Sequence, residues 1–496
     1  MNHLTPYRAK IAIVGAGVSG LGCAYLLSQS NEVKLFETAP KIGGHARTIL
    51  AGKNADVPVD TGFIVFNYEN YPQLSHMFKE LDVPVKKSDM SFAASIGDGA
   101  IEYGMSSFNM MAAQRRNVIR PKFWNMMRDI MRFNENAVDL SRDPNMSLEE
   151  FLDKMKMGDW FRNYYFLPIS GAIWSATPEQ MKGFPAKSLV QFFDNHSLLS
   201  WNTNQWYTVD GGSEQYLSRM ATAIHRFGGS IRVNSQVTGV KRNGANVYVK
   251  SKKGEWERFD RVIFACHSDQ VLPLLVDPTD AEKSIIGSIK YQKNKAVMHT
   301  DVTQMPKRKR AWASWVYKSK TMRPDPKVGI TYWMNSLQSL PTKEQIFVSL
   351  NPSSDINDNL IYDEKLFEHP IFDKQAFVAQ EKLKAIQGEN LTYYCGAWTR
   401  YGFHEDGYAS AVSVSELIAS ISTYYVIMYA TPGPNNSILT ASGIKFGFLK
   451  TIPNIFGIPT GHSIQLTLVC FGLGSLFIHF PYLLSVLKYL GATYLM

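Results

Sequence analysis

One short segment near the start of the chain constrains the fold more than any other. Residues 11–14 form an apolar, β-branched run typical of a buried parallel strand, and an apolar-periodic helix follows shortly after it. Gly15, Gly17 and Gly20 stand between them. This spacing allows a tight turn at Gly15, close approach of a pyrophosphate to the backbone at Gly17, and close helix packing at Gly20. The segment therefore predicts an α/β fold with a Rossmann-like, dinucleotide-binding domain.

An acidic residue follows at the distance that this fold requires. A second predicted strand, Glu32 to Phe36, ends at Glu37, which comes 22 residues after Gly15. A carboxylate in this position accepts hydrogen bonds from a ribose 2′-hydroxyl and disfavours a 2′-phosphate. The alternative is an ordinary strand-to-helix turn without a ligand. The order of strand, glycines, helix, strand and acid favours the nucleotide site.

A second glycine pair extends the pattern. Gly43 and Gly44 precede His45 and Arg47, and an extended segment then closes at Gly62. This arrangement resembles the FAD-binding start of the flavin amine oxidase and phytoene desaturase superfamily, and the resemblance implies FAD rather than NAD as the cofactor. Members of the superfamily often carry arginine directly after the doublet. Here His45 has that place and Arg47 follows two residues later, so either side chain is a candidate for the pyrophosphate.

Three later segments continue the resemblance in the same order. Residues 208–212 (TVDGG) resemble the mid-chain glycine element, and Val237 occupies the place where such enzymes stack backbone against adenine. Residues 394–398 and 402–407 look like the closing flavin motif, whose glycine opens a helix aimed at the flavin ring. A helix N-terminus there would stabilise negative charge on the reduced flavin.

The resemblance covers roughly residues 8–420 and is closest to bacterial predicted NAD/FAD-binding oxidoreductases found beside cyclopropane fatty acid synthases. It implies a set of FAD contacts spread over all of these motifs: Gly15, Gly17, Ser19, Gly20, Glu37, Gly43, Gly44, His45, Arg47, Gly62, Val237, Gly396, Asp406 and Gly407.

The sequence assigns no firm acid or base. His404 and Glu405, in the closing motif, are the candidate catalytic residues, and the alternative is a solvated turn beside the cofactor. Flavin hydride chemistry needs little acid–base help, because the cofactor itself accepts the hydride. We expect structural roles for His267 and His299. No metal site is expected, since there is no HExxH motif and the four cysteines show no CxxC spacing.

The flavin segments, residues 1–70, 207–267 and 389–420, are interrupted by two insertions. Residues 71–206 and 268–388 are expected to form a mixed α+β substrate domain. The first insertion is rich in methionine and aromatic residues, which either fill a core or line an apolar channel for an acyl or isoprenoid chain. In the second, residues 312–315 and 331–335 alternate in the manner of strands, which either wall the flavin or pack as an ordinary sheet.

The last part of the chain differs from the rest in its amino-acid composition. After Glu416 there is no aspartate or glutamate, and residues 464–480 form an apolar run of 17 residues. This predicts a C-terminal α-helical membrane segment within residues 421–496, with a buried soluble core as the alternative. The motif TPGPN at 431–435 and the residues after it resemble the beginning of the lysine exporter (LysE/RhtB) family of amino-acid efflux proteins. Because members of that family continue for several more helices, we expect no complete transport path.

Charge and composition limit the classes of binding partner that we expect and the expected location of the protein. A net charge of +9 without clustering on a known fold is weak evidence for nucleic acid. The densest basic run, residues 307–310, is either a solvated turn or a contact with an anionic membrane. The first residues lack the long apolar stretch of a signal peptide, so we expect none. We therefore expect a cytoplasmic catalytic part, attached to the inner (plasma) membrane through residues 421–496.

These observations predict an FAD-dependent oxidoreductase. It would transfer a hydride from a C–C or C–N bond of a small lipid-like or amine substrate to the flavin. The alternative function is amino-acid efflux by a membrane protein with a fused flavoprotein domain.

Overall fold

The computed structural model describes residues 8–174, 176–196, 198–200, 204–252, 254–322, 329–430, 442–445 and 447–468. The chain divides into two compact units, residues 1–416 and 417–496. The two units are described separately below.

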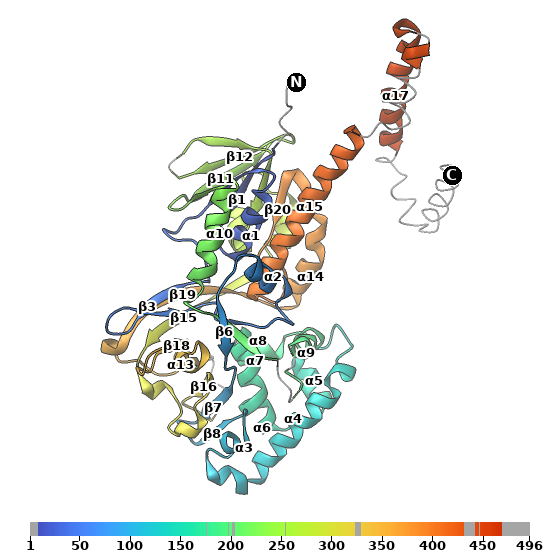
Figure 1. Cartoon of the computed structure of the whole chain (residues 1–496). Coiled ribbons are helices and arrows are strands. Elements are labelled where there is room, and N and C mark those ends of the chain that lie inside the picture. The colour runs from blue at the N-terminus through green and yellow to red at the C-terminus, as the bar shows by residue number, and fades with distance from the viewer. Residues whose placement is uncertain are drawn as a thin grey trace. The chain divides into compact units, whose positions relative to one another are not determined.

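A parallel sheet forms the middle of one lobe of the first unit (Figure 1). Its central strand β1 pairs in parallel with β2 on one side and β14 on the other. Ile11, Ala12 and Ile13 are fully buried because both faces of the sheet are covered. Three distant parts of the chain supply the strands, in the order β10 (Ser230–Arg232), β2 (Glu32–Phe36), β1 (Lys10–Val14), β14 (Arg261–Phe264) and β20 (Thr392–Tyr394).

Helices and a small antiparallel sheet cover this core. Helices α1 (Val18–Leu27) and α10 (Glu214–Arg226) pack against each other. The remaining elements of this lobe share a buried apolar cluster with the parallel sheet: β11 (Val237–Arg242), β12 (Val247–Ser251), β13 (Trp256–Phe259), α11 (Ser268–Leu274), α12 (Asp280–Ile286) and α14 (Lys374–Lys382). The last helix to begin in the first unit is α15 (His404–Ala430).

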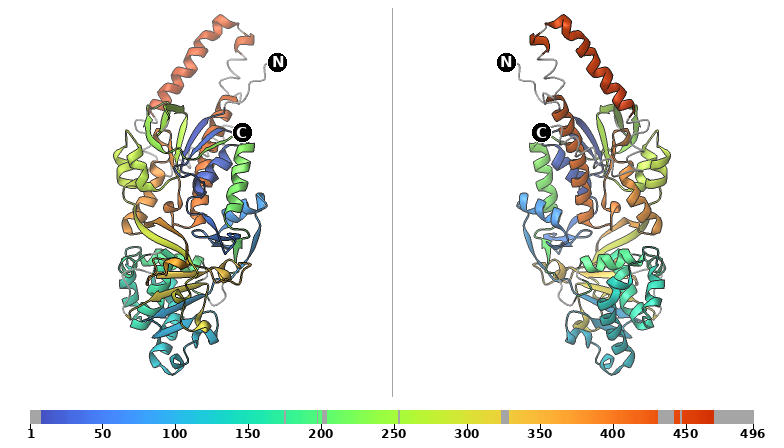
Figure 2. Two further views of the ribbon diagram at one scale, coloured as in Figure 1. Left: turned by 90° about the vertical axis from the view of Figure 1, so that its left-hand side faces the viewer. Right: turned by 90° about the vertical axis from the view of Figure 1, so that its right-hand side faces the viewer.

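A mixed seven-stranded sheet organises the other lobe. Its strands come from both predicted insertions, in the order β19 (Ile361–Ile371), β15 (Lys290–His299), β18 (Phe347–Leu350), β17 (Gly329–Trp333), β16 (Trp315–Ser319), β7 (Phe92–Ile96) and β8 (Ile101–Gly104). Figure 2 shows the helices of this lobe beside these strands. They are α3 (Phe108–Met111), α4 (Pro121–Leu140), α5 (Leu148–Lys154), α6 (Asp159–Phe161), α7 (Leu167–Trp174), α8 (Pro178–Lys182), α9 (Ala186–Asn195) and α13 (Met334–Leu337), with the single turns η1 (Arg115–Ile119), η2 (Arg162–Phe166) and η4 (Lys309–Ala311).

Methionine and aromatic side chains fill the space between these helices and the sheet. Phe123, Met126, Phe161 and Phe166 are fully or almost fully buried in one continuous cluster. Of the two alternatives for the Met-rich insertion, core filling therefore accounts for most of these residues.

The predicted strand pattern in the second insertion is only partly right. Strand β16 begins at Trp315, so Trp312 lies before it, where its indole nitrogen donates to the Pro306 carbonyl. Strand β17 ends at Trp333, and Asn335 lies in the short helix α13. The ring of Trp312 packs against Trp333 and Phe347, which makes it a sheet-packing residue.

Short strands join the two lobes. Strands β3 (Thr48–Ala51) and β4 (Val57–Asp60) form a hairpin, and β9 (Trp206–Val209) lies between β5 (Val65–Phe66) and β6 (Val85–Ser88). Helix α2 (Pro72–Glu80) follows β5.

The second unit contains helix α17 (Phe448–Leu468). Within the described residues, no helix combines the length and the apolar character needed to cross a bilayer. The predicted apolar run 464–480 lies mostly outside the described residues, so the expected membrane segment is not confirmed.

Candidate active site

The predicted flavin residues gather at one edge of the parallel sheet. The carboxyl ends of β1, β2, β14 and β20 lead into Gly15, Glu37, Ala265 and Cys395. The chain leaves β1 toward β2 on one side, while β14 lies on the other, so the strand order reverses between β1 and β14. In open α/β sheets a ligand binds outside the carboxyl ends at such a reversal. Several loop residues at this edge stay partly exposed, whereas the strands behind them are buried.

The three glycines of the first motif have different reasons to lack a side chain. Gly15 has a φ of 101°, and a Cβ there would lie 3.0 Å from the Ala265 carbonyl oxygen. A Cβ on Gly20 would lie 1.8 Å from the Gly15 carbonyl oxygen, so this glycine lets helix α1 start directly against the turn. A Cβ on Gly17 would meet no protein atom within 4 Å. Gly17 therefore faces open space at the N-terminus of α1, where the motif predicts the pyrophosphate.

Glu37 lies where the sequence predicts the ribose acid. Its carboxylate accepts hydrogen bonds from the backbone nitrogens of Ala16 and Ala39, both at 2.8 Å. A carboxylate has about four acceptor positions, so two remain for a ribose. Glu37 thus fixes the glycine turn and keeps capacity for a sugar hydroxyl.

The second glycine pair closes against the first motif. Gly43 donates its backbone N–H to the Ala16 carbonyl at 2.8 Å, and a Cβ on Gly44 would lie 3.2 Å from Gly17 Cα. Gly62 packs on the backbone of His45, where a Cβ would lie 1.8 Å from the His45 carbonyl oxygen. These close approaches place His45 beside the open space at Gly17.

The side chain of Arg47 points to the other lobe and not to the predicted pyrophosphate position. Its guanidinium pairs with Asp363 on β19 in a bidentate ion pair, with distances of 2.5 and 2.9 Å, and also contacts Thr61. The two candidates for the pyrophosphate therefore differ. His45 has a buried Nε2 without a partner among the described residues, while Arg47 ties the two lobes together.

The mid-chain glycine element, residues 208–212, is held close to the second glycine pair by the buried acid Asp60. Asp60 accepts hydrogen bonds from Ser213 N, Thr48 Oγ1 and Gln338 Nε2, at 2.9, 2.6 and 2.8 Å. Burial raises the pKa of Asp60 to about 6, although these hydrogen bonds act to lower it. The sequence predicted the segment but gave no role to Asp60, the last residue of β4, which joins Ser213 to Gln338 directly after α13.

Val237 lies at the start of β11, buried in the same cluster as Phe36. The segment before it is held to the Glu37 loop by backbone hydrogen bonds from Ser235 to Glu37 and from Asn234 to Ala39. This places Val237 near the acid that is predicted to bind the ribose. Its contact with adenine stays a prediction.

The closing motif brings a second helix N-terminus to the first. A Cβ on Gly407, in α15, would lie 2.8 Å from Val18 Cγ1 and 3.0 Å from Ser19 Oγ, both in the first turn of α1. Asp406 accepts a hydrogen bond from Phe403 N at 3.0 Å and so caps α15. Gly396 has a φ of 154° and donates its N–H to Ser410 Oγ. The starts of α1 and α15 therefore lie side by side, as an anionic cofactor would require.

The two candidate catalytic residues differ in surroundings. Glu405 accepts hydrogen bonds from the backbone nitrogens of Gln73 and Leu74, at 3.0 and 2.9 Å, and so caps the N-terminus of α2. This is a structural task, and we assign Glu405 no catalytic one. His404 stacks on Phe63, with ring centroids 3.9 Å apart, and its Nε2 lies 2.7 Å from Tyr216 Oη.

Three further histidines lie close to the second glycine pair. The His45 ring lies 5.5 Å from that of His267 and 5.3 Å from that of His369, and it stacks on Phe367. His267 in turn stacks on Tyr291, and its Nδ1 is buried without a partner among the described residues. We call His45, His267, His369 and His404 the histidine cluster.

Burial keeps the histidine cluster uncharged. It lowers the pKa of His45 and His267 to about 4, and that of His369 and His404 to about 3, with neighbouring histidines adding to the effect. The sequence expectation of a structural role for His267 did not foresee this cluster. His369 comes from β19, far along the chain and outside every motif, so no sequence signal marked it. His299 does have the expected structural role, bonded to Ser349 and to Asp301 N.

The family comparison agrees with this geometry. The family model for flavin-containing amine oxidoreductases matches residues 18–339. The chain belongs to this family. It is accordingly an FAD-dependent oxidoreductase with an amine oxidase-like catalytic unit. The LysE type translocator model matches residues 426–496, which indicates that this flavoenzyme associates with a membrane.

Solved structures share the fold of the flavoenzyme. A mutant of putrescine oxidase made to redesign cofactor binding is 14% identical, with a TM-score of 0.63, and the alignment covers 83% of this chain and 99% of that one. The CLA-producing fatty acid isomerase from P. acnes is 14% identical, with a TM-score of 0.58 and coverage of 83% and 98%. Cyclohexylamine oxidase from Brevibacterium oxydans is 13% identical, with a TM-score of 0.58 and coverage of 83% and 100%. No curated protein matches the chain.

The residues at the sheet edge fit FAD. Gly17 opens onto space that a side chain would fill, and the starts of α1 and α15 meet beside it. The buried Nε2 of His45 has no hydrogen-bond partner among the described residues. Glu37 retains acceptor positions for a ribose. Among the described residues, no group of three or more His, Cys, Asp or Glu side chains is arranged to hold a metal ion.

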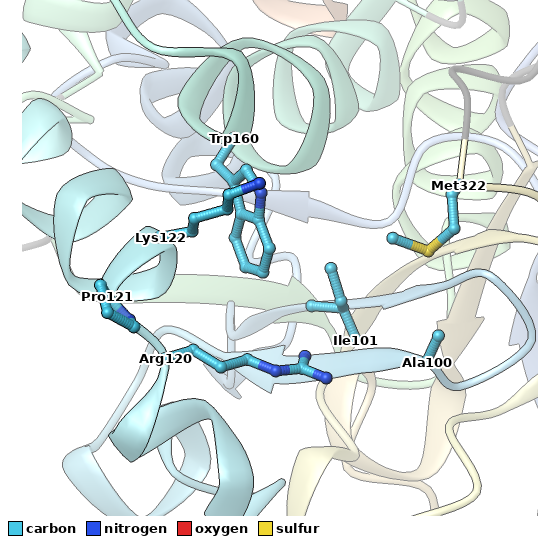
Figure 3. Close-up of a pocket in the computed structure, with 7 residues that line it drawn as sticks. All are labelled: Ala100, Ile101, Arg120, Pro121, Lys122, Trp160 and Met322. Carbon is cyan, nitrogen blue, oxygen red and sulfur yellow. The ribbon is translucent and has the colours of Figure 1, made fainter.

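A cavity of about 510 Å³ lies in the other lobe, away from the sheet edge (Figure 3). Ile101, Trp160 and Met322 surround it, and Arg120 and Lys122 approach it from the start of α4. The cavity combines an apolar wall with two cationic side chains.

Proposed function

We propose that this flavoenzyme oxidises a C–C or C–N bond of an apolar substrate that is uncharged when it reacts, a lipid-like molecule or a neutral amine. When bound, FAD supplies the hydride acceptor for this reaction. The protein binds the cofactor through Gly17, Glu37 and the helix starts, and it positions the substrate beside the histidine cluster. Stacking on Phe63 and the hydrogen bond with Tyr216 fix the ring of His404, which would form one side of the substrate position.

The observation that carries this proposal is the absence of formal charge in the histidine cluster. All four rings have a lowered pKa and stay neutral at pH 7, and they stack on Phe63, Phe367 and Tyr291. Neutral rings give an ammonium ion no charged partner to repay the loss of its hydration. The neighbouring carboxylates are already engaged, Glu405 with the backbone nitrogens of Gln73 and Leu74, and Asp406 with that of Phe403. A neutral substrate needs no such partner, so an amine would be oxidised in its free-base form.

The test compares two substrates of equal chain length. The purified, FAD-loaded full chain in detergent is mixed with a long-chain alkylamine or with the alkene that has the same number of carbons, and flavin reduction is followed without oxygen. We expect reduction by the uncharged compound at neutral pH, and a rate with the amine that rises about tenfold per pH unit below the amine's own pKa, as its free base becomes available. Faster reduction by a short diamine at neutral pH would contradict the proposal.

Amino-acid efflux is kept as a second candidate because of the translocator match at residues 426–496. It predicts release of lysine from proteoliposomes that contain the full chain. If the flavoprotein part is only an attachment to a carrier, Gly17→Val would leave such release unchanged. If the protein is an oxidoreductase, the same variant loses flavin reduction, and neither the variant nor the unmutated chain releases lysine.

A further inference from the structure

Helix α3 and the start of α4 lie at the end of the substrate lobe farthest from the parallel sheet (Figure 1). Several large apolar side chains of this region are exposed. Phe108 on α3 is 64% exposed, Ile119 in η1 is 82% exposed, and Trp124 on α4 is 44% exposed. Val118, between them, is 38% exposed and its carbonyl accepts a hydrogen bond from Trp124 Nε1 at 2.7 Å. We call residues 108–128 the apolar tip. Arg115 donates a hydrogen bond to Asn109 at 3.0 Å and so links η1 to the helix that carries Phe108. Exposed large apolar side chains on linked segments mark an interaction surface.

The apolar tip is also strongly basic. Residues 103–128 contain Arg115, Arg116, Arg120, Lys122 and Arg128 and no aspartate or glutamate. The described hydrogen bonds of the first three go to backbone carbonyls and to Asn109 and Asn117 rather than to carboxylates. Their positive charge is therefore available to an anionic partner.

The basic run found in the sequence joins the same surface. Helix α3, which carries Phe108, contacts the turn η4 (Lys309–Ala311). Within the run, Lys307 and Arg308 pair with Asp98 and Glu102, while Lys309 and Arg310 are exposed. Two more cations thus lie beside the apolar tip.

We propose that the apolar tip docks onto an anionic lipid bilayer. Phe108, Ile119 and Trp124 enter the boundary between headgroups and acyl chains, and the surrounding arginines and lysines contact lipid phosphates. Apolar side chains ringed by arginine and lysine are the combination that binds such a surface. The lipid is favoured over a protein partner by the absence of acids in this stretch and by the translocator match, which brings the same chain to a membrane.

The cavity of the same lobe supports this docking surface. Arg120 and Lys122 belong both to the apolar tip and to the cavity lining, and Trp160 and Ile101 provide an apolar wall behind them (Figure 3). A lipid whose phosphate meets Arg120 and Lys122 can place the first part of an acyl chain against that wall. The docking surface and the cavity thus share Arg120 and Lys122.

The test must separate the apolar tip from residues 421–496, where the translocator match points to a second membrane contact. A polarity-sensitive fluorophore is attached at Ile119→Cys in the full chain, and a matched control carries it at Val276→Cys, a residue 63% exposed in the other lobe. The unmutated chain, treated identically, gives the background from the native cysteines. Each protein is mixed with phosphatidylglycerol or phosphatidylcholine vesicles.

We expect the label at position 119 to shift to the blue, and to be quenched by brominated acyl chains, on phosphatidylglycerol vesicles only. The label at position 276 should not respond. A label at 119 that stays in water while the chain co-sediments with the vesicles would overturn the proposal, as would equal responses at both positions. The first of these outcomes would leave a protein partner as the occupant of the apolar tip.

A second set of variants tests the charges. Arg115→Gln, Arg116→Gln and Lys122→Gln should each weaken the response at position 119 about fivefold, and added salt should weaken it in the unmutated chain. Lys283→Gln, an exposed lysine in the other lobe, is the matched control and should have no effect. Equal effects of the control and the tip variants would contradict the assignment.

Discussion

Gly17 and Gly20 stand three residues apart, yet a side chain at each would meet different surroundings. We predict that Gly17→Val removes flavin binding and changes the free energy of unfolding of the flavin-free chain by less than about 1 kcal/mol, because its Cβ contacts no atom of the described residues. Gly20→Val should lose both flavin and fold, because its Cβ overlaps the Gly15 carbonyl. FAD titration and urea unfolding of the two variants check this. A Gly17→Val protein that binds FAD normally would show that the pyrophosphate lies elsewhere.

The histidine cluster predicts a pH dependence of stability. An unfolded histidine has a pKa near 6.5, while the folded values are about 3 to 4, so the unfolded chain binds more protons between pH 6.5 and 4. The free energy of unfolding therefore falls as the pH drops through this window. Each group contributes at most about 1.4 kcal/mol per pH unit, and less where a ring is partly exposed.

Two buried acids act in the opposite direction. Burial raises the pKa of Asp60 and Asp406 to about 6, so the folded chain binds more protons at these two groups between pH 6 and about 4. The histidines outnumber them, and the net effect is destabilisation by acid. Urea unfolding from pH 7 to 4 should show this slope, and the double variant His267→Asn, His369→Asn should show a flatter one. An unchanged slope in the double variant would count against the buried, neutral state of these rings.

Local spacing explains which site residues could be predicted from the sequence. Gly15 and Glu37 were predicted because the turn and the helix start need particular residues at fixed distances along the chain, and Gly407 because its segment resembles the closing flavin motif. His369 and Asp60 could not be, since β19 and the mid-chain glycine element reach the site only through tertiary packing. The FAD contacts stay a prediction. In the structure Arg47 is directed to Asp363, and the candidate catalytic residue Glu405 is directed to the N-terminus of α2.

At the scale of secondary-structure elements, one buried ion pair joins three parts of the flavin lobe. Glu282 on α12 accepts hydrogen bonds from Arg242 on β11 at 3.0 Å, from Thr279 N at 2.7 Å, and from the hydroxyl of Tyr394 on β20. Burial acts to raise the pKa of Glu282, but these hydrogen bonds outweigh it and lower the pKa to about 2. The network fixes strand β20, which leads into the closing flavin motif.

We predict that Glu282→Ala lowers the free energy of unfolding by about 3 kcal/mol, because it removes the buried partner of Arg242 and leaves that charge only its pair with the part-exposed Asp277. Lys283→Ala, which breaks an exposed pair with Asp280 on the same helix, should change it far less. Thermal unfolding of both variants with saturating FAD provides the comparison. Equal losses would mean that the network adds nothing beyond a surface pair.

Elements with a strong local pattern were easier to predict than those in the second insertion. The run 11–14 and the helix after it were expected and are present as β1 and α1. Residues 312–315 alternate like a strand, yet β16 starts only at Trp315, because Trp312 is held by Pro306 and packs against rings of β17 and β18. Alternation records which side chains are buried, and tertiary contacts can bury them without a strand.

At the scale of the whole molecule, the division into two units predicts that the catalytic part folds by itself. A chain that lacks residues 421–496 retains all of unit 1–416, including the start of α15 and every predicted FAD contact. We expect it to purify with FAD, to unfold in one transition, and to reduce its flavin at the rate of the full chain. Loss of flavin on this deletion, with the fold retained, would show that the tail contributes to the site.

The most direct test of the account is the visible spectrum of the purified full chain during anaerobic addition of an uncharged, apolar substrate. The account predicts the bands of oxidised flavin before addition and their bleaching afterwards, with no bleaching in Gly17→Val. A chain that stays colourless after reconstitution with FAD would contradict it, as would bleaching by a charged diamine but by no neutral compound.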